Sequence, residues 1–187
     1  EEPFLDESKA IFNLIQGADA TISWSRFQEI IYELRARRIL QGNRTLFISP
    51  KALHIKLWSD WWENYGRGFS IDEFIAKLPP QLQGWFFSMF EYAKESRVSA
   101  QVVDDLLSIH GPFDFPLLQA PAGSQLFLTL TSANPSAALN CLERTVGILS
   151  KEELGKFTSG RRQIIFALEK IVVWKGLFGR GAKLLLK

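Results

Sequence analysis

The chain has 187 residues, of which 47% are hydrophobic and 13% aromatic, and this composition excludes an intrinsically disordered protein. Its formal net charge of +2 is too small to indicate nucleic-acid binding by itself. The single cysteine, Cys141, excludes an internal disulfide and a cysteine-based metal site, and it fits a reducing, cytoplasmic setting. The sequence contains no apolar run of about 18 residues, so it predicts no membrane-spanning helix.

The first predicted element is a helix over residues 6–15, which presents apolar residues on one side and ends at Gly17. A second helix is predicted from Ser25, because Ser25 followed three residues later by Gln28 is the pattern of a capping box. Between the two helices, residues 20–22 could form a short strand. The apolar face of the second helix is expected to consist of Phe27, Ile30, Ile31 and Leu34.

Two short strands are predicted after the second helix. Ile39 and Leu40 would open the first strand, and residues 45–48 would form a second strand that is rich in β-branched and aromatic residues. The Gly42-Asn43 pair can take the positive φ values that a tight hairpin turn requires.

A third helix is predicted up to Gly66, with Ser49 as its cap and Pro50 at its first position, where a missing N–H costs nothing. The order helix, helix, two strands and helix is that of a winged helix, so residues 1–66 are predicted to form a winged-helix domain. The third helix has a tryptophan-rich face, which we interpret as a buried junction with the rest of the chain rather than as a stacking platform for a ligand. This face consists of Leu53, Leu57, Trp58, Trp61 and Trp62.

Residues 67–187 are predicted to form an all-helical array of short helices with short connections. A possible loop boundary lies at residues 112–123, where three prolines occur. No fixed repeat period is present, so the array matches no named repeat. The predicted helices begin at Ser70, Leu82, Ala100 (capped by Ser99), Pro135 (capped by Asn134), Arg161 and Leu177, and a capping box of Ser150 and Glu153 begins another.

Three details of this array are specific enough to test. The helix from Leu82 is expected to run without interruption to Ala93. Residues 124–131 alternate like a strand, but helices flank them, and we favour a helix. The helix from Arg161 is expected to end at Trp174 and to turn inward Ile164, Ile165, Leu168, Ile171 and Val172.

The sequence contains no P-loop, no H-E-x-x-H and no G-x-S-x-G motif, and it therefore predicts neither an enzyme nor any catalytic, cofactor-binding or metal-ligating residue. The stretch from Gly176 to Lys183 is the nearest to a P-loop, but it lacks the required spacing. His54 and His110 lie in separate segments without neighbours that could share a metal ion.

An alternative class is a DNA-binding winged helix with a helical oligomerisation domain. The helix from Ser25 would then be the recognition element. Glu29 and Glu33 on that helix count against this class, because phosphate would repel them. The net charge of −1 over residues 1–66, from 8 Lys and Arg against 9 Asp and Glu, also counts against it. The side chains that could reach phosphates or base edges are those of Arg26, Arg35, Arg37, Arg38, Asn43 and Arg44.

Residues 34–53, with the sequence LRARRILQGNRTLFISPKAL, combine a helix that ends in a basic turn, a hairpin and a new helix. Residues 134–139, 168–171 and 177–186 add a helical pattern further along the chain. In these segments the chain resembles the region that follows the nucleotide-binding core in bacterial signal-transducing P-loop ATPases of the STAND class, which include NACHT-type and NB-ARC-type proteins. Because the chain begins without Met and ends within an apolar helical pattern, we expect a fragment of a longer protein.

This resemblance implies a non-catalytic module that docks on the nucleotide-binding core of its own protein and relays movement to downstream repeats. ATP or ADP would be bound by the parent protein, since this chain has no P-loop and should not hydrolyse ATP. Many members of the family have a histidine at the junction of the wing and the next helix. Ser49-Pro50 takes this place here, and His54 lies about one helical turn further on. The residues expected to take part in docking are Arg35, Arg38, Arg44, Ser49 and His54.

Overall fold

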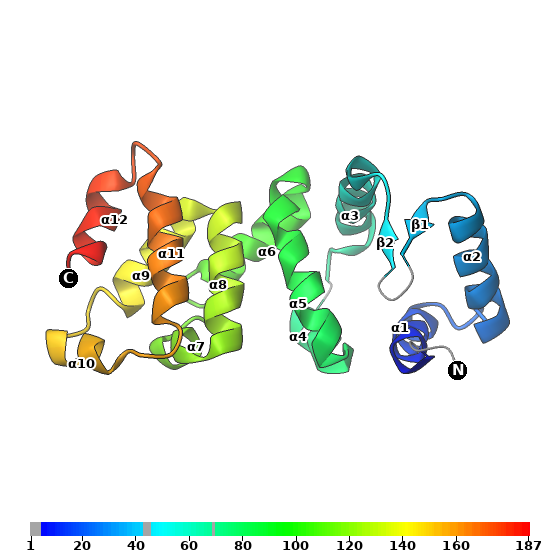
Figure 1. Ribbon diagram of the computed structural model, residues 1–187, viewed down its shortest axis with the longest axis horizontal. Coiled ribbons are helices and arrows are strands. Elements are labelled where there is room, and N and C mark those ends of the chain that lie inside the picture. Colours follow the sequence, from blue (N-terminus) through cyan, green and yellow to red (C-terminus); the bar gives the residue numbers. More distant parts are fainter. Residues whose placement is uncertain (1–4, 43–45, 69) are drawn as a thin grey trace. The chain divides into compact units, whose positions relative to one another are not determined.

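The computed structural model describes residues 5–42, 46–68 and 70–187. The protein is mainly helical, with one two-stranded antiparallel sheet in the part of the chain that is described, which confirms the fold class at this level (Figure 1). The chain folds as two compact units, Glu1–Trp85 and Phe86–Lys187. The division between residues 66 and 67 that the sequence predicted is a different one, and it stays a prediction.

The N-terminal unit begins with α1 (Leu5–Ala18) and α2 (Trp24–Ala36). Helix α1 runs past Gly17, so the prediction that this glycine ends the helix was wrong. Residues 20–22 form a turn rather than a strand, because the main-chain N–H and the hydroxyl of Thr21 both donate to the Asp19 carboxylate. Helix α2 packs on α1 through aromatic side chains, with the ring centroids of Phe12 and Trp24 5.2 Å apart.

Helix α2 begins earlier than the sequence predicted. Its cap is Ser23, whose hydroxyl accepts a hydrogen bond from the main-chain N–H of Arg26 at 3.2 Å. Ser25 therefore lies inside the helix, and the predicted capping box with Gln28 was wrong. Both serines fit the cap preference, but only Ser23 has the extended backbone that a cap requires, with φ −81° and ψ 159°.

The predicted strand pair is present as β1 (Leu40–Gln41) and β2 (Phe47–Ile48), with Leu40 opposite Ile48 and Gln41 opposite Phe47. Residues 42–46 connect the two strands, and most of the predicted tight turn falls on residues 43–45, which lie outside the described residues. Gly42 does have a positive φ of 105°. Asn43, the other residue of the predicted turn, lies outside the described residues.

Helix α3 (Lys51–Tyr65) follows the strands. Its cap position is held by Pro50, without a side-chain hydrogen bond, so Ser49 is not the cap. The main-chain N–H of Ser49 instead donates to the carbonyl oxygen of Ile39 at 2.8 Å and prolongs the ribbon. Trp62 is fully buried, with Trp58 and Trp61 edge-on against it. Gly66 ends α3 as expected, and α4 (Ile71–Lys77) and α5 (Pro80–Ser88) come next.

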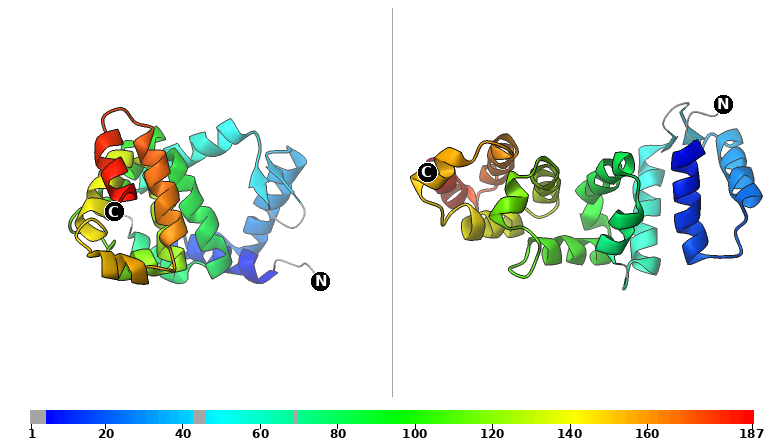
Figure 2. Two further views of the ribbon diagram at one scale, coloured as in Figure 1. Left: turned by 60° about the vertical axis from the view of Figure 1, so that its left-hand side comes forward. Right: turned by 90° about the horizontal axis from the view of Figure 1, so that it is seen from below.

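The C-terminal unit is built around two helices, α8 (Pro121–Ala133) and α11 (Arg161–Val172), which lie side by side (Figure 2). Phe127 and Leu130 of α8 and Ile171 of α11 are fully buried, so the core of this unit lies between these helices and their neighbours. Its other helices are η1 (Met89–Glu95, a 3₁₀-helix), α6 (Arg97–Leu107), α7 (Phe115–Gln119), α9 (Pro135–Thr145), α10 (Lys151–Lys156) and α12 (Phe178–Leu185).

Several predictions for this unit are confirmed. Residues 124–131 are helical. The Asn134 side chain caps α9 by accepting from the N–H of Ala137 at 3.0 Å. The capping box of Ser150 and Glu153 is complete at the start of α10. The hydrogen bond from the Ser150 N–H lowers the pKa of the Glu153 carboxyl.

Three predictions were wrong. The helix from Leu82 does not continue to Ala93, because it changes to a 3₁₀-helix at Met89. Ser99 does not cap α6. Ser96 does, and the buried Ser99 hydroxyl donates to the Ala93 carbonyl oxygen at 2.7 Å. The loop predicted at residues 112–123 was wrong from residue 115 on, because α7 and the start of α8 lie there.

Candidate functional site

The basic residues expected to dock lie where α2 ends. The N–H of Arg38 donates to the Arg35 carbonyl oxygen at 2.9 Å, and the N–H of Ile39 donates to the Leu34 carbonyl oxygen at 2.9 Å. With Arg37 as the cap, these two bonds form a Schellman motif, in which the residue after the cap takes a left-handed conformation. That residue is Arg38, with φ 58°. A position that usually belongs to glycine is therefore occupied by an exposed arginine.

The end of α2 is tied to the ribbon by side chains. The Arg35 guanidinium donates to the Gly42 carbonyl oxygen at 3.5 Å, and the Gln41 amide donates to the Arg38 carbonyl oxygen at 3.0 Å. Ser49 joins the same region, because its N–H bonds the residue that follows Arg38 in sequence. The structure thus brings together three of the five predicted docking residues, Arg35, Arg38 and Ser49.

The two remaining docking residues are not part of this arrangement. His54 is half-buried in the first turn of α3, where its N–H donates to the Pro50 carbonyl oxygen at 3.3 Å. Arg44 lies outside the described residues, as does Asn43, so their predicted roles stay predictions.

The residues proposed for DNA contact on α2 are partly engaged with acids. The Arg26 guanidinium lies 2.7 Å from the Glu29 carboxylate and 3.9 Å from that of Glu33. The hydrogen bond to Glu29 raises the pKa of Arg26 above its usual value. Arg37 is exposed at the end of the helix. The outward face of α2 therefore carries both signs of charge, and phosphate would have to compete with two carboxylates for Arg26.

The N-terminal unit also exposes apolar side chains. None of the residues of α2 is fully buried, and Phe47 of β2 is 52% exposed. Exposed apolar side chains of this size are groups that a partner protein could cover. Among the described side chains of this unit, the large apolar ones that are exposed are Tyr32, Leu46, Phe47, Leu57, Tyr65 and Trp85.

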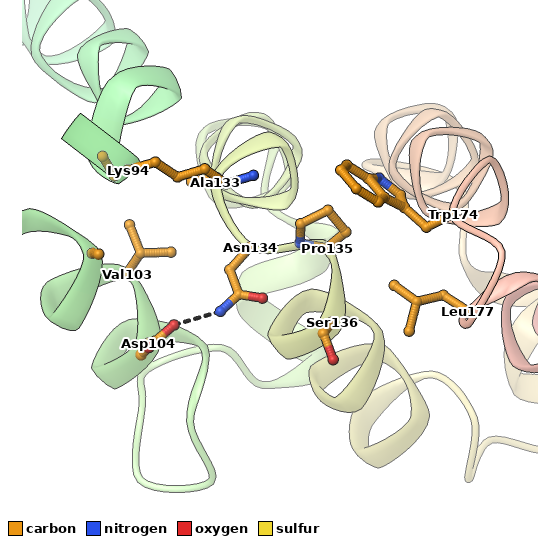
Figure 3. A pocket seen from close by; sticks show the side chains of 11 residues that line it. Lys94, Val103, Asp104, Ala133, Asn134, Pro135, Ser136, Trp174 and Leu177 are labelled. Atoms are coloured by element: carbon orange, nitrogen blue, oxygen red, sulfur yellow. Dashed lines mark hydrogen bonds between the residues drawn. The ribbon is translucent and has the colours of Figure 1, made fainter. Parts of the chain in front are cut away.

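A cavity of about 350 Å³ lies in the C-terminal unit, between η1, α6, the start of α9 and the segment after α11 (Figure 3). The Lys94 ammonium lies 5.5 Å from the centroid of the Trp174 ring, within the range of a cation–π contact. The Asn134 amide donates to the Asp104 carboxylate at 2.6 Å. The rest of the wall is largely apolar and includes Val103, Ala133, Pro135 and Leu177.

A second cavity, of about 580 Å³, lies between α8 and α11 and shares Pro135 and Trp174 with the first. Leu128, Phe166 and Val173 give it apolar walls. The Lys170 ammonium lies at this cavity and donates to the Ser132 hydroxyl at 2.7 Å. We call the two cavities together, with Trp174 at their common wall, the Trp174 groove.

The sequence did not predict this groove. We expected α11 to have one apolar face, but Phe166, Val173 and Trp174 form a second apolar stripe next to the buried one. Val173 is 77% exposed and Trp174 51% exposed. Ile165, predicted to be inward, is exposed, and α11 ends at Val172 rather than at Trp174. Phe166 and Val173 are two helical turns apart and so lie on the same side of the helix, and this spacing could have predicted the second apolar stripe.

In the part of the chain that the structure describes, no three His, Cys, Asp or Glu side chains come together in a way that could hold a metal ion. Among the same residues, every helix is too short or too polar to cross a membrane. Comparison of the chain with protein-family models, curated proteins and solved structures finds no match.

Proposed function

We propose that this chain is a non-catalytic regulatory and interaction module of a larger, cytoplasmic, multidomain ATPase. Residues 1–66 would form a winged helix that docks on the nucleotide-binding core. Residues 67–187 would be a helical array that passes the movement of the core to downstream repeats. ATP or ADP would belong to the core, and this chain would contribute no catalytic residue.

The observation that carries this proposal is the apolar surface of the ribbon and of α2. Phe47 is half exposed on β2, Leu46 precedes it, and Tyr32 projects from α2. A DNA-binding surface would be polar and basic at these positions, whereas a protein surface would cover the apolar groups and gain free energy from their burial.

The basic residues at the end of α2 would lie at the polar rim of such an interface. Arg35 and Arg38 lie beside the ribbon, and both are exposed. In this proposal their guanidinium groups pair with carboxylates of the core around the apolar centre, Ser49 is a polar partner beside them, and His54 would contact the core from the first turn of α3. Arg44 is the fifth proposed docking residue, and it is included because of its place in the sequence.

DNA binding is the competing function, in which α2 would be the recognition helix of a winged helix with a helical oligomerisation domain. The ion pairs that Arg26 makes with Glu29 and Glu33 count against it. A nucleic-acid interface concentrates positive charge, and a phosphate bound by Arg26 would lie near these two carboxylates.

The proposal is tested by calorimetric titration of this chain with the nucleotide-binding domain of the same open reading frame, expressed separately and loaded with ADP or with ATP. We expect saturable binding that depends on the nucleotide and is weakened about tenfold by Phe47→Ser, because central apolar residues dominate such contacts. Ile148→Ser, at an exposed apolar residue of the C-terminal unit, is the matched control and should leave the affinity unchanged.

Titration with duplex DNA at rising salt is the second arm of this test. Specific, salt-dependent DNA binding that is lost on Arg38→Ala and Arg44→Ala would reject docking in favour of the DNA-binding class. The absence of a P-loop domain from the open reading frame would reject the proposed parent protein.

A further inference from the structure

We propose that α12 lies on the surface of an anionic membrane, with Phe178 and Leu186 in the lipid and lysines at the headgroups. All of the residues concerned belong to the unit Phe86–Lys187. The inference therefore does not depend on the docking of residues 1–66 or on an ATPase parent. A helix of this kind rests in the plane of the membrane and does not cross it.

Helix α12 turns one of its sides to solvent. It packs on α11, where a Cβ atom at the buried Gly181 would lie 2.8 Å from the Val172 side chain (Figure 1). It is also tied to α9, where the Arg180 guanidinium donates to the Glu143 carboxylate. These contacts use two sides of the helix, and the remaining side carries its exposed apolar residues.

The exposed apolar residues of α12 form one stripe. Phe178 is 60% exposed and Leu186, at the end of the helix, is 88% exposed, with the exposed Leu185 beside it. Together with Ala182 they occupy positions i, i+4, i+7 and i+8, the spacing of residues on one side of a helix. Such a stripe gains free energy when it leaves water.

The charges of this segment favour an anionic surface. The chain has no acidic residue after Glu169, which lies at the cavity between α8 and α11. Residues 175–187 contain four basic residues, Lys175, Arg180, Lys183 and Lys187. Anionic lipids attract basic residues that lie close to the membrane surface, and each such residue adds to the affinity.

Two acidic side chains of neighbouring helices offset part of this charge. Glu143 of α9 is paired with Arg180, and it also attracts Lys183. Glu153 of α10 lies close enough to Lys187 for their charges to attract. Two carboxylates against four basic groups leave a surplus of two positive charges at α12 and the turn before it.

The arrangement of the stripe favours a membrane over a protein partner. Its side chains project from a single helix, and neither of the two cavities described above is lined by a residue of α12. A protein partner would have to supply a hollow that matches them, whereas lipid adapts to projecting side chains. Lys183 and Leu186 are three residues apart and therefore neighbours on the helix surface, so this ammonium can reach the headgroups beside the inserted leucine.

The experiment is co-sedimentation of the full chain with vesicles, made either of phosphatidylcholine alone or of phosphatidylcholine and phosphatidylserine in equal parts. We expect binding to the phosphatidylserine vesicles that falls as salt is added, and much weaker binding to phosphatidylcholine. Phe178→Ser together with Leu186→Ser should weaken the binding at least about tenfold, because both side chains leave the lipid. Tyr65→Ser together with Ile109→Ser, two equally exposed apolar residues outside α12, is the matched control and should leave the binding unchanged.

A second pair of variants measures the charge contribution. Lys175→Glu together with Lys183→Glu should weaken binding at least about tenfold. Lys9→Glu together with Lys77→Glu changes the net charge by the same amount at exposed lysines of the other unit, and it should have little effect. Every replaced side chain is exposed, so each variant should stay folded, which far-UV circular dichroism checks.

The proposal is overturned if the chain does not bind the phosphatidylserine vesicles, or if it binds both kinds of vesicle equally. Equal losses for the α12 variants and their controls would overturn it as well. Capture of the chain by polyglutamate but not by the anionic vesicles would mean that α12 recognises an acidic protein, and the membrane would be the wrong partner.

Discussion

Arg38 donates its main-chain N–H to the carbonyl oxygen of Arg35 while its own backbone is left-handed, with φ 58°. This conformation costs an L-residue about 1–2 kcal/mol, whereas glycine adopts it freely. Arg38→Gly should therefore raise the free energy of unfolding by about 1 kcal/mol. Urea unfolding followed by tryptophan fluorescence measures this change, since five of the six tryptophans lie in residues 1–85.

Arg37→Gly is the matched control for this prediction. Arg37 is the preceding residue and has an ordinary φ of −80°, so glycine gains nothing there and should destabilise the unit by up to about 1 kcal/mol. If both variants destabilise equally, the left-handed assignment of Arg38 is wrong. If Arg38→Gly also weakens docking on the nucleotide-binding domain, the Arg38 guanidinium has a role in binding that explains why a strained backbone is kept at this position.

Cys141 offers a chemical measure of unfolding in the C-terminal unit. It is fully buried in α9, and this burial raises the pKa of its thiol to about 11, so the thiol stays protonated at neutral pH. We expect iodoacetamide to modify the native protein only at the rate at which the unit opens, and to modify the urea-unfolded protein completely. Stoichiometric labelling of the native protein at neutral pH would show that Cys141 is accessible, contrary to the packing described.

Gly160 is a position at which the fold requires glycine. Its φ is 65°, and a Cβ atom there would lie 2.2 Å from the carbonyl oxygen of Leu118. Gly160→Ala should lower the free energy of unfolding by more than about 1 kcal/mol, because it adds both strain and a clash with the main chain. The labelling rate of Cys141 in rising urea measures the loss.

Gly179→Ala is the control for Gly160→Ala. Gly179 lies inside α12, where an added Cβ has no neighbour within 4 Å, so alanine should stabilise this helix by up to about 1 kcal/mol. Opposite signs for the two variants are expected. A loss for both would mean that α12 does not occupy its described position.

The contact between α12 and α9 should depend on pH. The Arg180 guanidinium donates to both carboxylate oxygens of Glu143, with the Nε to Oε1 distance at 2.9 Å, and this hydrogen bonding lowers the pKa of the Glu143 carboxyl from its ordinary value of 4.5. Because the folded state then binds the proton less well than the unfolded state, the pair contributes stability above pH 4.5, which is lost as the pH falls through the lowered pKa. The Glu143 side chain is 38% exposed, so solvent screening limits the contribution to about 0.5 kcal/mol.

Urea unfolding of Glu143→Gln at pH 7 and at pH 3 checks this prediction. The variant should be less stable than the wild type at pH 7, and the difference should shrink at pH 3. A constant difference between Glu143→Gln and the wild type at the two pH values would contradict the sign derived above.

Local signals in the sequence predicted most of the elements. The apolar periodicity predicted most of the helices and the strand pair, and the caps at Asn134 and Ser150 are confirmed, but α7 falls in a predicted loop and the caps expected at Ser25, Ser49 and Ser99 were wrong. Errors occurred where two residues of one type competed, as Ser23 and Ser25 did for the cap of α2. The side chains are equivalent in sequence, and only the backbone conformation decides between them.

The Trp174 groove could not be predicted in the same way. Which apolar stripe of α11 is buried depends on the helices around it, and Asp104, Lys94 and Trp174 come from segments far apart in the chain. Arg35, Arg38 and Ser49 lie near the ribbon because Arg35 and Arg38 precede β1 closely in sequence and Ser49 directly follows β2. Their role in docking stays a prediction. No signal in the sequence indicated the left-handed backbone of Arg38.

The docking claim is tested most directly by hydrogen–deuterium exchange of this chain with and without the ADP-loaded nucleotide-binding domain of its own open reading frame. We predict slower exchange in the complex at residues 35–41 and 46–49, where the end of α2 meets the ribbon, and a loss of that protection in Phe47→Ser. Protection confined to other segments, or none at saturating concentration, would contradict a docking role for this surface.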